Sequence, residues 1–200
     1  GKDYTDIIKA KFGDFIPGLK DCGIFDIRAE LLLPFSNLAT ARKYNPNIKS
    51  AFTGVSSMSR GSATIMEYRL LDVVCYNIFT TNKTFTSLSE KFDFLTNCGF
   101  LVPIFCCGVL SKDTFDADIK EVMDYMAEQQ AGYDYYTDGV VLSVDNIAQF
   151  EAMGTTDVCT LGNVALKMGV WEQLPYTAKV KKIKWTKGKS VRTPVAVIEP

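Results

Sequence analysis

Apolar and polar residues alternate along residues 24–33, and this alternation is the clearest local pattern in the chain. A period of two predicts a β-strand with one buried face. The apolar face would carry Phe25, Ile27, Ala29 and Leu31, and the charged face would carry Asp26, Arg28 and Glu30. A charged strand face is most simply a solvated one. Two further segments, 71–78 and 135–144, also carry polar or aromatic residues within apolar runs, so three strands could instead wall a pocket.

The remaining hydrophobic pattern mixes helical and strand periods. Helical spacing predicts helices within 1–20 and at 36–44, 88–98, 114–131 and 147–153. Apolar runs predict strands at 70–78, 100–107, 135–144 and 161–168, and a hairpin of 180–185 with 191–198. This combination predicts an α+β protein.

Several residues set the expected boundaries of these elements. Ser36 would cap the second helix, and a capping box of Ser87 and Glu90 would open the third. Pro103 makes the 100–107 segment an edge strand or an extended segment. Residues 52–64 are small and polar, which indicates a surface loop.

Composition excludes several classes of protein. The chain has 200 residues, enough for one sizeable domain, and no apolar run reaches the length of about 18 residues that a membrane helix needs. No secretion signal is recognisable at the N-terminus, so we expect a cytoplasmic protein that binds no membrane. The six cysteines form no C-x-x-C pair and lie mostly in apolar segments, which favours buried thiols and predicts no metal site. There is no histidine, so no Ser-His or Cys-His nucleophile can be built.

Charge is unevenly distributed. The chain carries −1 overall, yet residues 179–192 hold seven basic and no acidic residues, so the remainder carries −8. We therefore divide the chain at this change of character, into 1–177 and a basic β segment, 178–200. The basic residues could contact DNA phosphates, or could keep an edge strand soluble. The candidates for DNA contact are Lys179, Lys182, Lys184, Lys187, Lys189 and Arg192, with Lys181 also in the segment.

Five short motifs occur in a characteristic order and spacing: residues 27–30 (Ile-Arg-Ala-Glu), 74–76 (Val-Cys-Tyr), 138–142 (Asp-Gly-Val-Val-Leu), 164–167 (Val-Ala-Leu-Lys) and 193–200 (Thr-Pro-Val-Ala-Val-Ile-Glu-Pro). In these motifs the chain resembles the adenylation domain of bacterial-type NAD-dependent DNA ligases over essentially its whole length. The resemblance implies a nucleotidyltransferase (ATP-grasp-like ligase) fold of mainly antiparallel sheets with flanking helices, followed by the first strands of an OB-fold. It also implies NAD as adenylate donor, magnesium, and nicked duplex DNA as substrate.

The resemblance also implies roles for individual residues. Glu30 matches the glutamate of the family's Arg-Gly-Glu strand, which contacts the adenylate ribose, and Arg28 matches the arginine. Tyr76 matches the aromatic residue that stacks on adenine, although it could also be an ordinary core tyrosine. Lys167 matches the lysine at the α-phosphate, and Asp138 matches the acidic residue of the Asp/Glu-Gly-Val-Val strand. Catalysis would thus rest on Lys167, Glu30 and Asp138.

The chain also departs from the family's pattern. Ala29 replaces the glycine of the Arg-Gly-Glu strand, and Ser143 stands where the family has a second α-phosphate lysine. The two arginines of the family's arginine-bearing loop fall on Ser56 and Thr64, which leaves Arg60 as a displaced substitute that would bind cofactor.

The family's Lys-x-Asp-Gly nucleophile motif is absent from the 200 residues. In the family this motif lies upstream of the segment that resembles residues 1–5, and so does the element that recognises the nicotinamide half of NAD. We therefore expect one part of an NAD-dependent DNA ligase: either a subunit of a split enzyme, completed by a second subunit that carries the lysine, or a part of a longer chain with the same chemistry. The alternative is a non-catalytic, ligase-like module that binds nucleotide or DNA.

Overall fold

The computed structural model describes residues 3–13, 16–60, 68–157, 159–166, 177–187 and 192–199. The chain separates into two compact units, Gly1–Met168 and Gly169–Pro200, which we describe one at a time. Helices and small antiparallel sheets are both present, so the α+β class is confirmed. The domain boundary at residues 177 and 178 stays a prediction.

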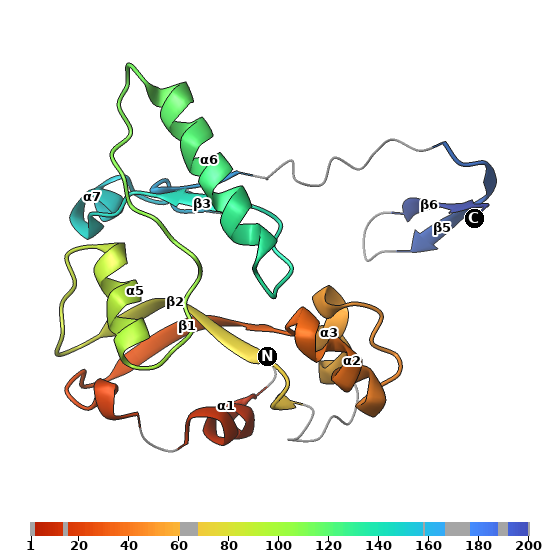
Figure 1. Ribbon diagram of the computed structural model, residues 1–200, viewed down its shortest axis with the longest axis horizontal. Coiled ribbons are helices and arrows are strands. Elements are labelled where there is room, and N and C mark those ends of the chain that lie inside the picture. The colour runs from red at the N-terminus through yellow and green to blue at the C-terminus, as the bar shows by residue number, and fades with distance from the viewer. Residues whose placement is uncertain are drawn as a thin grey trace. The chain divides into compact units, whose positions relative to one another are not determined.

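The first unit is built around a two-stranded antiparallel sheet of β1 (Phe25–Leu32) and β2 (Asp72–Thr80) (Figure 1). The strand predicted from the alternation at 24–33 is confirmed. Its apolar face is only partly buried, since Phe25 and Ala29 are exposed and Ile27 and Leu31 are half-buried. Glu30 is the Cα partner of Val74, and Arg28 that of Asn77. The register shifts between Arg28 and Ala29, which leaves Tyr76 as an extra residue of β2. Such a bulge bends the strand and re-aims the side chain at that position.

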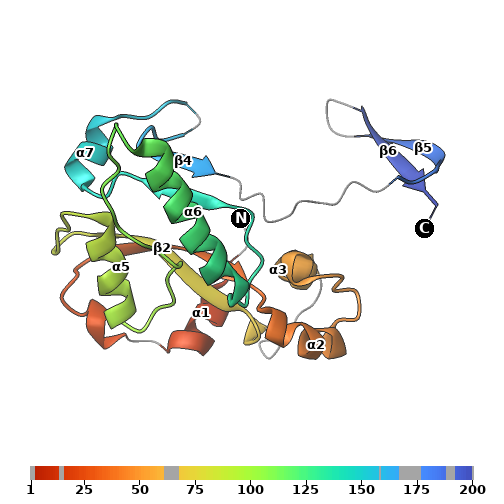
Figure 2. The ribbon, with the colours of Figure 1, turned by 45° about the horizontal axis from the view of Figure 1, so that its top comes forward.

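A hydrophobic cluster covers one part of this sheet. It joins β2 to α5 (Leu88–Asn97) and to the 3₁₀ helix η1 (Pro17–Leu19). Its buried members are Leu19, Cys22, Val73, Cys75, Ile78, Leu95 and Phe100. The first helix, α1 (Thr5–Phe12), lies on the opposite side of the sheet from α6 (Figures 1 and 2) and contributes the Phe12 ring, 5.0 Å from that of Phe100.

A second cluster packs α2 (Phe35–Tyr44) and α3 (Ala51–Arg60) against the end of β1. Its buried members are Leu33, Ala41, Ile48, Met58, Tyr68 and Leu71. The surface loop predicted at 52–64 is therefore wrong for residues 52–60. The small residues there serve close packing instead, since a Cβ added at Gly54 would lie 2.4 Å from a methyl carbon of Leu33.

Helix capping follows the sequence at one site and departs from it at another. The Ser87 side chain accepts a hydrogen bond from the Glu90 amide at 3.1 Å, as the capping box predicts. The Glu90 carboxylate accepts from the Thr86 amide and hydroxyl, which lowers the pKa of Glu90. Ser36 does not cap α2, because Pro34 is the N-cap residue and Ser36 binds Asp134.

The remaining elements of the first unit are α6 (Phe115–Ala131), β3 (Val140–Ser143), α7 (Ile147–Ala152) and β4 (Asn163–Leu166). The strand predicted at 135–144 is shorter than expected, because residues 135–139 form an irregular loop. Within the described residues β3 pairs with β4 and not with β1 or β2, so the three polar strands do not form one sheet. The segment after α5 is extended, with a single bridge from Leu101 to Val74, as Pro103 predicts.

The second unit contains the predicted hairpin, β5 (Val180–Lys187) paired with β6 (Arg192–Ile198). Its assignment to an OB-fold stays a prediction. None of the described helices is long and apolar enough to cross a membrane.

The cysteines differ from expectation. Cys22 and Cys75 are buried, but Cys106, Cys107 and Cys159 are exposed because they lie in irregular segments outside both clusters.

Candidate functional site

A groove of about 610 Å³ lies between the end of β1, helix α3 and the loop that precedes β3. Its described lining contains two carboxylates and three aromatic rings among smaller side chains. The lining residues are Tyr4, Glu30, Leu31, Leu32, Leu33, Ala51, Phe52, Val55, Ser56, Tyr136 and Asp138. The groove therefore brings together Glu30 and Asp138, two predicted site residues that are 108 positions apart in the sequence.

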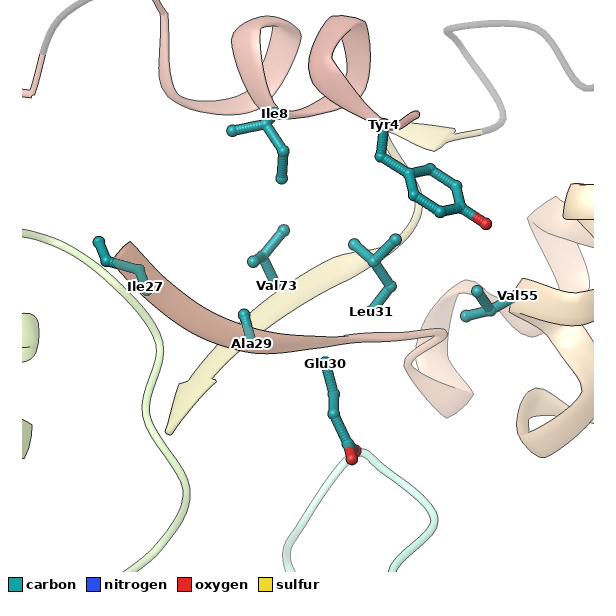
Figure 3. Close-up of a pocket in the computed structure, with 8 residues that line it drawn as sticks. All are labelled: Tyr4, Ile8, Ile27, Ala29, Glu30, Leu31, Val55 and Val73. Carbon is teal, nitrogen blue, oxygen red and sulfur yellow. The ribbon is translucent and has the colours of Figure 1, made fainter. Parts of the chain in front are cut away.

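Glu30 reaches the groove because of its place in the strand alternation. Figure 3 shows Ile27, Ala29 and Leu31 pointing toward the α1 side of the sheet and Glu30 pointing the other way, toward the loop before β3. The apolar side has a hollow of about 430 Å³ of its own, lined by Tyr4, Ile8, Ile27, Ala29, Glu30, Leu31, Val55 and Val73. The charged face of the strand is thus a groove wall at Glu30.

The loop that carries Tyr136 and Asp138 is tied to the first sheet and to α2. The Asp134 carbonyl accepts from the Phe35 amide at 2.8 Å, and its carboxylate accepts from the Ser36 amide at 2.9 Å. One residue on, the Tyr135 hydroxyl donates to Asp72 Oδ2 at 2.5 Å. Burial, and then the Asp72 carboxylate, raise the pKa of Tyr135. These contacts hold the loop, in which Asp138 lines the same groove as Glu30 of β1.

The groove is negatively charged. Glu30 and Asp138 are both exposed, and neither carboxylate forms a hydrogen bond or ion pair within the part of the chain that the structure describes. No lysine or arginine is among the described lining residues. The groove can therefore accept hydrogen bonds from hydroxyl or amino groups of a ligand, and its described part offers no cation to a phosphate.

An aromatic pair in the groove was not predicted from the sequence. The rings of Phe52 and Tyr136 lie 4.9 Å apart at an angle of 56°, and the Phe52 side chain is 71% exposed. Phe52 was overlooked because its segment was interpreted as a loop. The sequence does contain a signal for this helix: Ala51, Val55 and Met58 are apolar at helical spacing, which predicts a helix with one face in the core.

Two other predicted cofactor residues lie on the same sheet but do not line the groove. Tyr76 is 45% exposed at the bulge of β2, so it is not a core tyrosine. The Arg28 guanidinium carbon lies 4.9 Å from the centre of the Phe79 ring. The amino group of Lys91 lies 4.7 Å from the same centre and donates to Asn77. Burial lowers the pKa of Lys91.

Several predicted residues lie outside the described part of the chain. Lys167 and Lys189 are among them, as are the side chains of Arg60 and Lys187. The strand before Lys167, β4, is described as far as Leu166, whose Cα partner is Val140. At the position of the family's second lysine, the Ser143 hydroxyl donates to Asn163 Oδ1 at 2.6 Å.

The hairpin of the second unit exposes those of its basic residues whose side chains the structure describes. Lys182 and Lys184 are two positions apart on β5 and therefore share a face. Ile183 and Trp185 alternate with them and are 57% and 64% exposed. Lys179 and Arg192 are exposed as well, and Lys181 lies 4.0 Å from the Glu199 carboxylate.

Comparison with known proteins identifies the family. The model of the NAD-dependent DNA ligase adenylation domain matches residues 25–168. DNA ligase 1 of Clostridium acetobutylicum is 28% identical over 188 residues, which cover 89% of this chain and 26% of that protein. A DNA ligase of Finegoldia magna is 25% identical over 186 residues, which cover 91% of this chain and 27% of that protein. A DNA ligase of Borrelia duttonii is 32% identical over 133 residues, which cover 64% of this chain and 19% of that protein.

The chain thus spans about a quarter of the length of the first two relatives. The family match includes β1, β2, β3 and β4, and with them both walls of the groove. An adenylation domain implies a nucleotidyltransferase fold, in agreement with the small antiparallel sheets. Since the match covers more than half of the chain, this protein belongs to the family of NAD-dependent DNA ligase adenylation domains.

Proposed function

We propose that this chain supplies the adenylate-binding part of an NAD-dependent DNA ligase that seals nicks in duplex DNA. The observation that carries the proposal is the groove that Glu30 of β1 and Asp138 of the loop before β3 both line. In this proposal Glu30 accepts hydrogen bonds from the ribose hydroxyls of the adenylate, and Tyr76 provides a stacking surface for adenine. NAD, with magnesium, is the adenylate donor.

The strand register supports this division of roles. Glu30 is the partner of Val74, and Tyr76 stands at the bulge two residues beyond Val74. In this proposal the bulge aims the Tyr76 side chain to the face of the sheet that carries Glu30. That face is the one from which Glu30 points toward the groove (Figure 3). A nucleoside on this face could rest its base on Tyr76 and direct its hydroxyls to Glu30. Arg28, on the same face, would lie beside the base.

The nucleophile must come from outside these 200 residues, because they contain no Lys-x-Asp-Gly motif. We propose that it is carried by another segment or by a second chain, which would make this part of a split ligase. Lys167 would neutralise charge that develops at the α-phosphate, with Arg60 as a further cation near the phosphates. The basic hairpin residues, led by Lys182 and Lys184, would bind the phosphates of nicked DNA.

The proposal is tested first by nucleotide binding. Calorimetric titration of the chain with AMP should show saturable binding that weakens about tenfold in Tyr76→Ala and in Glu30→Gln. Tyr125→Ala, an equally exposed tyrosine on α6, is the matched control and should bind AMP like the parent chain. If the parent shows no saturable binding of AMP, or if all three variants bind it equally, the adenylate-binding proposal is wrong.

Labelled NAD then tests the origin of the nucleophile. Incubated with NAD and magnesium, this chain should remain unlabelled, and label should appear on an added polypeptide that carries Lys-x-Asp-Gly. In that reconstituted reaction Lys167→Ala should slow adenylate transfer about a hundredfold. A stable lysine–AMP adduct on this chain would disprove the external nucleophile.

The contact between Ser143 and Asn163 favours a second candidate function, a binding module without catalysis. A hydroxyl engaged with an amide cannot replace the charge of a lysine at the α-phosphate. In that case Tyr76→Ala would still weaken the binding of AMP, and no added polypeptide would become adenylated.

A further inference from the structure

We propose that β1 pairs with β1 of a second copy of this chain, so that two copies share one antiparallel sheet in the order β2–β1–β1–β2. The pairing is centred on Ala29, which lies opposite Ala29 of the second copy. It goes beyond the proposed function by naming a partner, and only its consequence for Glu30 rests on that function.

Strand β1 has a free edge within the part of the chain that the structure describes. Its described pairing is with β2 alone, whereas the far edge of β2 is engaged by the bridge from Val74 to Leu101. Ala29, in the middle of β1, is exposed, so the centre of the free edge is open. An unpaired edge offers its amide and carbonyl groups to another strand, and a sheet of two strands gains stability from further strands.

The backbone groups of every second residue of β1 point to this free edge. The Cys75 amide donates to the Leu101 carbonyl at 2.7 Å and therefore points away from β1. Ala29 is the Cα partner of Cys75, and in an antiparallel pair two partners exchange both hydrogen bonds or neither. The amide and carbonyl of Ala29 thus point away from β2. By the alternation along a strand, those of Ile27 and Leu31 do the same.

Charge favours the pairing of β1 with itself. Two antiparallel copies centred on Ala29 place Arg28 of each directly opposite Glu30 of the other, at positions where facing side chains lie closest. Both side chains are exposed, and neither has an ion pair within the described residues. Because the pairing has twofold symmetry, one register forms two such ion pairs. On the apolar face, Ile27 meets Leu31 of the second copy.

The pairing occupies the carboxylate that the proposed function assigns to the ribose. In the single chain the Glu30 carboxylate lines the groove and has no partner among the described residues. In the dimer it faces the Arg28 guanidinium of the second copy. Adenylate and the second copy therefore compete for Glu30, and the dimer is a resting form that adenylate binding separates.

Analytical ultracentrifugation of the full chain measures the dimer. Between about 1 and 200 µM it should show a monomer–dimer equilibrium, since one strand edge is a small interface. Arg28→Glu should weaken the dimer at least about tenfold, because two attractive pairs become repulsive. Adding Glu30→Arg to this variant exchanges the charges and should restore the affinity to within about threefold of the parent. Asp26→Asn is the matched control and should change nothing, because this register places Leu32 opposite Asp26.

Substitutions of Ala29 test the centre of the pairing outside the groove, since its side chain lies on the opposite face from that of Glu30 (Figure 3). Ala29→Lys and Ala29→Glu should each be monomeric, because like charges would face each other, and a mixture of the two should form a heterodimer. Hydrogen exchange gives an independent readout. The amides of Ile27, Ala29 and Leu31 should gain protection as the concentration rises, whereas those of Arg28 and Glu30, which face β2, should not.

Several outcomes would overturn the inference. They are a monomer at every concentration, or a dimer that survives both Arg28→Glu and Ala29→Lys. Another is protection of the Ala29 amide only by an added polypeptide that carries Lys-x-Asp-Gly, because the edge would then bind that polypeptide.

AMP separates this inference from the proposed function. Saturating AMP should weaken the parent dimer at least about fivefold. A dimer that AMP leaves unchanged, in a chain that binds AMP by calorimetry, would place Glu30 outside the interface and overturn the inference. Failure of the parent chain to bind AMP would reject the proposed function, and the charge exchange between Arg28 and Glu30 would still decide the dimer.

Discussion

Asp72 is the residue whose replacement should most directly loosen the loop that carries Tyr136 and Asp138. Its carboxylate accepts from Lys11 of α1 at 2.7 Å through one oxygen and from the Tyr135 hydroxyl at 2.5 Å through the other. Lys11 also donates to the Leu71 carbonyl. One side chain thus joins α1, β2 and the loop before β3. Asp72→Asn keeps the shape of the side chain and removes its charge.

The expected cost follows from burial and charge. At 2.7 Å and an effective dielectric constant of about 20, the Coulomb energy between Lys11 and Asp72 is about 6 kcal/mol. Both side chains are 23% exposed, so desolvation and the loss of side-chain freedom offset most of this energy. Hydrogen bonds to a charged group contribute about 1.5 to 3 kcal/mol. We therefore expect Asp72→Asn to lower the free energy of unfolding by about 2 to 3 kcal/mol, and Tyr135→Phe by about 1 to 2 kcal/mol.

Urea unfolding followed by circular dichroism measures these costs, and the double variant measures their coupling. Because Asp72→Asn removes the charge from the hydrogen bond that Tyr135→Phe removes altogether, their effects should fall short of additivity by about 1 kcal/mol. Tyr133→Phe is the matched control. Its ring packs against Tyr135 at 4.9 Å, yet its hydroxyl has no hydrogen bond with the described residues.

A titration of tyrosinate absorbance gives an independent readout. The pKa of Tyr135 is raised in the folded chain, so this group stabilises the fold below the ordinary tyrosine pKa of about 10, and the contribution is lost as pH rises through the folded value. In Asp72→Asn the pKa of Tyr135 should fall, because a neighbouring negative charge is removed. The reasoning fails if Tyr135→Phe costs no more than Tyr133→Phe and the titration is unchanged by Asp72→Asn.

The remaining predictions concern the thiols and a helix cap. Burial raises the pKa of the Cys75 thiol to about 11, so alkylation near pH 8 should modify Cys106 and Cys107 well before Cys75, as peptide mass mapping would show. The raised pKa of Cys75 also stabilises the fold. This contribution is fully present below a pH of about 9 and is lost as the pH rises through about 11. Urea midpoints measured across this range should show the loss in the parent chain and not in Cys75→Ala. Ser87→Ala should lower the free energy of unfolding by about 1 kcal/mol, because it removes the N-cap of α5. Thr96→Ala, at the exposed end of the same helix, should lower it by less than about 0.5 kcal/mol. Equal losses in the two variants would contradict the capping argument.

Local patterns in the sequence determined the elements whose stability is local or whose periodicity is strong. The strand within 24–33, the Ser87 cap of α5 and helix α6 each depend on residues within two turns or one strand, and all three elements are present. The motif spacing also determined the family, and four of the five motifs lie on or beside β1, β2, β3 and β4 of the first unit.

Tertiary structure alone decided the groove. The small residues of 51–60 favour a loop by composition, but packing of Gly54 on Leu33 and burial of Met58 stabilise a helix, and that helix brings Phe52 to Tyr136. Ser36 is available as a cap, yet Asp134 binds it from a loop that is 98 residues away. Residues 135–139 have a strand-like composition but lie in a loop, because Tyr135 reaches Asp72 instead of pairing with a neighbour. Such contacts join residues far apart in the chain, so no local pattern encodes them, and only the packed structure determines which side chains share the site.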